Sequence, residues 1–220
     1  MKTLESRENM FLDYNWKEMN ELLLSAAVLG FAFSAVFSEA SGTFGFLLEY
    51  SFWYSFVFIS LASAFSLWLK TSLQKYTARV MESYIKYSYW VPGMIISFLS
   101  SFLGVLFTAV GGVEISTEYA ERFGRWKVNL TTQQMGLLST LGIMLYLGIG
   151  MVFYLVAGMV SAGSYTPFMD IARLNAFLAV FSLFPVDVMD GAKVMRWKWE
   201  LWSVVLALSV LVLALFTGLL

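Results

Sequence analysis

The stretch from Leu174 to Trp197 reads LNAFLAVFSLFPVDVMDGAKVMRW and gives the main clue to the fold. An apolar run ends at Pro185, and a short hydrophobic turn then leads into Asp190 and Gly191. Proline cannot continue a helix, and an Asp-Gly pair is a turn signal. The apolar run 171–185 is shorter than the roughly 20 residues that a helix needs to cross a bilayer. This part of the chain is therefore expected to be a short helix that breaks near a membrane.

The composition of the whole chain indicates an integral membrane protein. Hydrophobic residues make up 59% of the 220 residues and charged residues 13%, whereas soluble domains carry about 25% charged residues. The net charge of −1 argues against a nucleic-acid partner. The chain has no cysteine, which excludes disulfides and thiolate chemistry. The polar start of the chain lacks the apolar run of a cleaved signal peptide.

Hydrophobic runs predict an all-α polytopic membrane protein with about six segments. A polar N-terminal segment, 1–20, precedes a single membrane domain, 21–220. The segments are 22–37, 51–69, 91–113, 135–163, 171–185 and 201–220.

The polar linker 114–134 predicts a small β element near residues 113–131. Its β-prone pieces, 113–116 and 127–131, are separated by a turn at Gly124. Two such pieces joined by a turn are typical of a hairpin. We expect this hairpin at the membrane surface.

The distribution of positive charge favours a cytoplasmic N-terminus. The N-terminal segment carries three Lys or Arg and the linker 70–90 carries four, and such linkers prefer the cytoplasmic side. The linkers 114–134 and 186–200 carry three each, although strict alternation of six spans would place them outside. One segment is therefore expected not to cross, either 91–113, which would be re-entrant, or 171–185.

The stretch 174–197 resembles the aspartate motif of the site-2 protease family of intramembrane zinc proteases. In that family the Asp is the third zinc ligand, and an HExxH helix supplies two histidines. The sequence Lys75-Tyr76-Thr77-Ala78-Arg79 is similar to the basic stretch that commonly follows this helix. The resemblance covers roughly residues 60–202, and it implies a family core over about 51–200.

This register aligns Lys70 and Gln74 with the two histidines and Thr71 with the catalytic Glu. Lysine is a cation and repels zinc, glutamine is a poor zinc ligand, and threonine is not a base at neutral pH. The chain contains no histidine at all. The resemblance therefore implies a degenerate member with no catalytic residues, no zinc and no other cofactor.

Four features of the family's aspartate segment are retained and are expected to bind or to support structure: Asn175, Pro185, Asp190 and Gly191. Two roles are possible for Asp190. It is either a turn residue that bonds to nearby backbone N–H groups, or the partner of Lys70, which would replace the metal as a counter-charge. If Lys70 is not this partner, its ammonium is expected to reach the lipid headgroups.

Three classes of function remain open. The first is a catalytically inactive site-2 protease-like protein of the cell membrane, a scaffold or regulatory subunit whose partners are the bilayer and other membrane proteins. The second is a component of a transporter or channel, although no inverted repeat is present. The third is an active hydrolase in which Ser72 is activated by Lys70 or Lys75.

Overall fold

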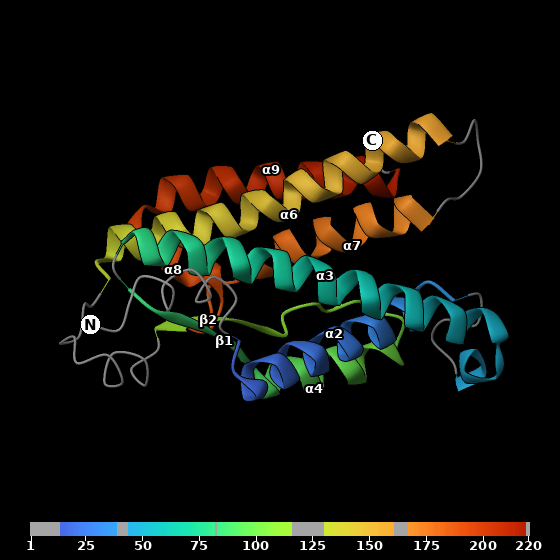
Figure 1. Ribbon diagram of the computed structural model, residues 1–220. Helices are drawn as coiled ribbons and strands as arrows, with labels where there is room; N and C mark the ends of the chain where they lie inside the picture. Colours follow the sequence, from blue (N-terminus) through green and yellow to red (C-terminus); the bar gives the residue numbers. More distant parts are fainter. Residues whose placement is uncertain (1–13, 39–43, 82, 116–129, 161–166, 219–220) are drawn as a thin grey trace.

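The computed structural model describes residues 14–38, 44–81, 83–115, 130–160 and 167–218. This part of the chain is mostly helical and contains one small sheet (Figure 1). In chain order the elements are α2 (Trp16–Val36), the 3-10 helix η2 (Phe44–Leu48), α3 (Tyr50–Val80), β1 (Ile85–Tyr89), α4 (Val91–Ser101), β2 (Gly111–Ile115), α6 (Thr132–Val160), α7 (Pro167–Ser182), α8 (Asp190–Trp197) and α9 (Trp199–Thr217).

Four helices in the described ranges, α2, α3, α6 and α9, are long and apolar enough to cross a membrane. The expected set of six segments is not found in this form. Helix α7 has 16 residues, and the segment 91–113 forms a helix, α4, of only 11 residues. Helix α4 ends because the chain turns at Gly104, where φ is 71° and the N–H donates to the carbonyl of Ser101.

The two strands pair antiparallel, with Ile85 opposite Ile115 and Tyr89 opposite Gly111. A strand near residue 113 is as predicted, and its partner among the described residues is β1 from the preceding linker. Residues 127–129 lie outside the described part of the chain, and 130–131 form no strand. Because Tyr89 and Gly111 are neighbours in the sheet, the segment between them leaves the sheet and returns to it.

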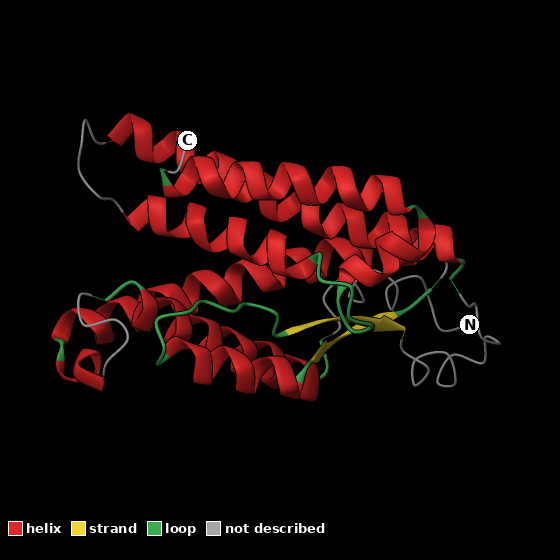
Figure 2. Ribbon diagram, turned by 180° about the vertical axis from the view of Figure 1, so that it is seen from behind, coloured by secondary structure: helices red, strands yellow, loops and turns green. Residues whose placement is uncertain are grey.

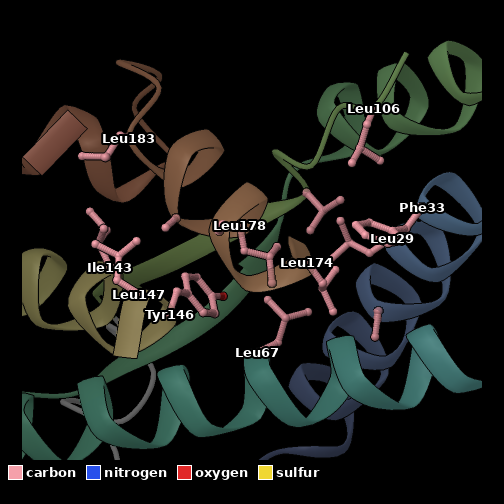
Figure 3. Packing of buried hydrophobic residues seen from close by; sticks show 14 of the residues in the cluster. Leu29, Phe33, Leu67, Leu106, Ile143, Tyr146, Leu147, Leu174, Leu178 and Leu183 are labelled. Atoms are coloured by element: carbon pink, nitrogen blue, oxygen red, sulfur yellow. The ribbon is translucent and has the colours of Figure 1, made fainter. Parts of the chain in front are cut away.

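Helix α3 lies between two layers of the molecule. Helices α6, α7 and α9 lie on one side of it, and α2, α4 and the sheet lie on the other, as both views show (Figures 1 and 2). Side chains from several elements meet in the core between these layers. Leu67 of α3, Tyr146 of α6 and Leu174 and Leu178 of α7 are all buried there (Figure 3). Helix α3 is therefore the element through which both layers can be held together.

Candidate functional site

Asp190 reaches the interior because a non-helical segment separates α7 from α8. Helix α7 ends at Ser182, and the chain then passes through Pro185, which is exposed. Helix α8 begins at Asp190, so the carboxylate lies at a helix N-terminus, where the peptide dipoles favour a negative charge. Gly191 is required at this point, because a Cβ atom there would collide with the backbone of Leu183.

The Asp190 carboxylate is almost fully buried, with 1% of the residue exposed, and its partners come from three helices. Its Oδ2 atom lies 2.5 Å from Lys70 Nζ and accepts a hydrogen bond from Gln74 Nε2 at 3.5 Å. Its Oδ1 atom accepts from Ser139 Oγ at 3.1 Å and from Lys193 Nζ at 3.5 Å. We call these five residues the Asp190 centre.

Helix α3 supplies Lys70 and Gln74 from one face, since residues four apart lie one above the other on a helix. Gln74 Nε2 also donates to the carbonyl of Leu138 on α6 at 3.3 Å. A glycine makes this close approach possible. A Cβ atom on Gly142 of α6 would lie 2.5 Å from Gln74 Nε2 and 3.0 Å from Lys70 Cε. Without that glycine, α6 and α3 would be forced apart at the centre.

Two ammonium groups thus lie around one carboxylate. Lys70 is 3% exposed and Lys193 is 8% exposed. Burial alone would raise the pKa of the Asp190 carboxyl, but the charges of Lys70 and Lys193 more than offset it and hold that pKa below its usual value. Lys70 Nζ also lies 5.2 Å from the centroid of the Tyr146 ring, a cation–π distance.

Lys193 joins the centre to the sheet. Its ammonium donates to the carbonyl of Val113 in β2 at 2.6 Å. Gly112 lies against the carbonyl of Val188, and a side chain at this glycine would collide with it. Burial lowers the pKa of the Lys193 ammonium, and the nearby Asp190 charge offsets this only in part. The small sheet is therefore fixed directly over the start of α8.

The structure brings together Lys70, Gln74 and Asp190. The alignment of residues 70–79 with the zinc-binding helix of the family predicted this proximity. The carboxylate's partners described here are side chains, so the alternative in which Asp190 bonds to the backbone of its own turn is not what the structure has. Lys70 points to Asp190 and not toward the lipid headgroups. Ser139, which donates to Asp190, was not predicted from the sequence. A serine three residues before Gly142 is a pattern of small residues that suggests close helix packing.

Other residues singled out from the sequence lie outside the centre. The Thr71 hydroxyl is buried and donates to the carbonyl of Leu67 at 2.8 Å. Asn175 is fully buried in α7 and donates to the carbonyl of Ile171 at 2.9 Å. The Ser72 hydroxyl shares a hydrogen bond of 2.9 Å with the hydroxyl of Tyr14. None of these contacts joins the Asp190 carboxylate.

The residues of the centre do not fit a zinc ion. Zinc sites use thiolate, imidazole and carboxylate ligands, and the described residues include no group of three or more His, Cys, Asp or Glu that could hold a metal. The centre has one carboxylate, and this group already accepts from four side chains. Protonated lysines have no lone pair for a metal, and the Gln74 amide nitrogen is used as a donor.

The chain is similar to a protein of Methanocaldococcus jannaschii named "Putative zinc metalloprotease MJ0611". The two are 26% identical over 136 residues, which is 60% of this chain and 66% of that protein, so the match spans just under two thirds of the relative's length. No protein-family model matches the chain, and no solved structure shows significant similarity to it. The similarity supports a relationship to metalloprotease-like proteins.

Proposed function

We propose that this chain is a catalytically inactive, site-2 protease-like membrane protein. In this proposal it binds transmembrane segments of other proteins without cutting them and acts as a scaffold or regulatory subunit. The observation that carries the proposal is the ion pair between Lys70 and Asp190, 2.5 Å apart. It joins two positions that the resemblance assigns to a zinc centre. The ammonium takes the electrostatic role of the metal, and it brings no nucleophile with it.

The same geometry argues against peptide hydrolysis. A zinc protease needs an open ligand position for water and a carboxylate base beside it. At the position aligned with that base, the Thr71 hydroxyl donates to the helix backbone. The serine alternative requires a lysine to activate Ser72, and the described hydrogen bond of Ser72 goes to Tyr14. Catalysis by either route lacks a base next to a nucleophile.

The proposed partners are the bilayer and the membrane helices of other proteins. Each of the four long helices has large apolar side chains that are more than one third exposed, for example Leu24, Leu61, Val152 and Leu211. In a membrane these side chains contact lipid or a neighbouring helix, since nothing in the described part of the chain covers them. Nucleic acid and zinc are not among the proposed partners.

We place the protein in the cell membrane with its N-terminus and its sheet on the cytoplasmic side. The N-terminal end of α2 lies beside β1, because Glu18 accepts from the N–H of Tyr87 at 2.7 Å. Strand β1 and helix α8 lie at this end of the molecule (Figure 1), and Lys86 and Lys193 belong to them, with Lys198 directly after α8. Basic residues gather on the cytoplasmic side of membrane proteins. Since the chain has no cysteine, labelling of a Lys17→Cys variant in sealed vesicles with an impermeant thiol reagent tests this orientation.

The experiment for the proposed function measures binding and cleavage together. The purified protein is reconstituted with single-span segments that carry a fluorophore, and energy transfer reports binding while mass spectrometry reports products. We expect transfer without cleavage, in the presence or absence of added zinc. Cleavage abolished by a chelator and restored by zinc would show an active metalloenzyme, and cleavage abolished by Ser72→Ala would show a serine hydrolase. Transfer no greater than with an unrelated membrane protein would contradict the binding role.

A further inference from the structure

The inner face of α3 carries a line of polar side chains that runs away from the Asp190 centre. Starting from Gln74 and Lys70, the line continues through Ser66 and Ser63. Ser63 and Ser66 are 0% and 1% exposed. Ile59, which is buried, and Ser55 follow on the same face, and both line a cavity at this end of the helix. The spacings of three and four residues keep these positions on one face of the helix.

Two hydroxyls of this line lack hydrogen-bond partners within the described chain. The Oγ atoms of Ser63 and Ser66 are buried and accept or donate no hydrogen bond there. A serine in a membrane helix can instead bond to the carbonyl four residues earlier. Ser209 of α9 does so, with its Oγ donating to the carbonyl of Val205 at 2.8 Å, although it is equally buried. The contrast shows that the serines of α3 orient away from their own backbone.

The line ends in a cavity at the far end of α3. This cavity has a volume of about 400 Å³ and lies between the end of α2, the start of α3 and the start of α7. Ser34, Ser55 and Asp170 are among its lining residues. The Ser34 hydroxyl is buried, with 4% of the residue exposed, and has no hydrogen-bond partner in the described part. The cavity thus provides one unpaired hydroxyl, that of Ser34, at one end of the line, and Gln74 Oε1 is unpaired among the described residues at the other.

We propose that water molecules fill this line and connect the cavity to the Asp190 centre. Side chains three or four residues apart on a helix have Cβ atoms about 5–6 Å apart, and two successive O–H···O hydrogen bonds of about 2.8 Å cover that distance. One water molecule therefore bridges Ser63 to Ser66, and in this proposal further water continues from Ser66 toward the Lys70 ammonium. Buried waters in proteins satisfy polar groups that otherwise have no partner.

The water line gives the ion pair a route to the aqueous phase at the end of the molecule opposite the sheet. From Ser55 to Lys70 the helix rises about 22 Å, at about 1.5 Å per residue, so the route covers most of the hydrocarbon thickness. Protons can move along such a file without any opening of the helices, whereas lipid and large solutes cannot enter. This inference does not depend on the proposed function, because it rests on the serines and the cavity.

Cysteine variants test the water line with a probe that is only slightly larger than the native side chain. The chain has no cysteine, so the S–H stretching band of a single variant has no background in the infrared spectrum. Ser63→Cys and Ser66→Cys place this probe in the line, and each serves if the other folds poorly. Ser209→Cys is the matched control, since it makes the same change at the same burial. After transfer into D2O, conversion to S–D reports contact with water.

We expect the thiols at positions 63 and 66 to exchange at least about 100-fold faster than the thiol at 209, because a dry buried group exchanges only through rare local opening. Adding Ser55→Phe, which blocks the cavity end, is expected to slow both line thiols roughly tenfold or more. Equal rates at 63, 66 and 209 would overturn the proposal, as would rapid exchange at 63 only. If Ser55→Phe leaves the rates unchanged, water enters elsewhere and the proposed route is wrong.

Discussion

Lys70 and Lys75 lie five residues apart on α3, and each forms an ion pair with a different layer of the molecule. Lys70 pairs with Asp190 of α8, and Lys75 pairs with Glu18 of α2 at 2.6 Å. The first pair is 3% and 0% exposed and the second is 12% and 5% exposed. Lys75 also lies 3.8 Å from the centroid of the Tyr14 ring.

The difference between the two pairs lies in what remains if a partner is lost. At the second pair, Glu18 also accepts from the Tyr87 N–H, and Lys75 retains an aromatic ring and some contact with solvent. At the first, loss of Asp190 leaves the ammonium groups of Lys70 and Lys193 buried without a counter-charge. A buried charge without a partner is far more costly than a broken pair near water. Breaking the Asp190 centre is therefore expected to cost more free energy of unfolding than breaking the pair of Lys75 and Glu18, although α3 contributes one lysine to each.

The largest effect is expected for Asp190→Ala. The change removes the carboxylate and leaves two buried cations, so we expect a loss of about 3–5 kcal/mol in the free energy of unfolding. Asp190→Asn is expected to be nearly as damaging, since it keeps an acceptor and removes the charge. Unfolding by denaturant in detergent measures both variants. If both unfold like the wild type, the ion pair contributes nothing to stability.

A second change in the same centre separates charge from packing. Adding Lys70→Met to Asp190→Asn removes one of the stranded cations and keeps a long apolar side chain. We expect the double variant to be more stable than Asp190→Asn alone, with a coupling energy of roughly 1–3 kcal/mol. A double-mutant cycle measures this energy. Additive losses would show that Lys70 does not act as the counter-charge.

A smaller effect is expected from Gly142→Ala on α6. The new methyl group would lie 2.5 Å from Gln74 Nε2, so α6 must shift or Gln74 must leave its hydrogen bonds. Overpacking of this kind costs about 1–3 kcal/mol. Gly148→Ala is the matched control on the same helix, since no atom lies within 4 Å of a Cβ atom placed there. A control that is as destabilised as Gly142→Ala would contradict this explanation.

A smaller loss of stability is expected when the ion pair between Lys75 and Glu18 is broken. Glu18→Gln keeps an acceptor for the Tyr87 N–H and removes the charge opposite Lys75. We expect a loss of about 1 kcal/mol, because Lys75 remains close to solvent. Thermal melting in detergent measures the change. A loss as large as that of Asp190→Asn would remove the contrast between the two pairs.

The smallest effect is expected at the exposed pair of Asp187 and Arg196. Its side chains are 80% and 60% exposed, and such pairs contribute about 0–1 kcal/mol. Arg196→Ala should therefore melt within about 0.5 kcal/mol of the wild type. A larger loss would mean that this arginine has a partner or a packing role beyond the ion pair.

The sequence allowed the helices and part of the centre to be predicted, because both depend on local patterns. Apolar runs identified the four long helices, and the Pro-x-x-x-x-Asp-Gly pattern identified the break at Asp190. The pairing of β1 with β2 could not be predicted from local patterns, because it joins residues 22 to 30 positions apart (89 to 111 and 85 to 115). It also depends on the turn at Gly104 inside an apolar run. Ser139 was missed because a lone serine in a membrane helix carries no signal of its partner.

The distance along the chain between Lys70 and Asp190 has a consequence for synthesis of the protein. The two positions are 120 residues apart (190 − 70). Chains grow at about 5–20 residues per second, so Lys70 is made roughly 6–24 s before its counter-charge exists. During this interval the Lys70 ammonium can reach the headgroups from its place near the end of the helix. The final depth of α3 in the membrane is therefore set only when α8 has been made.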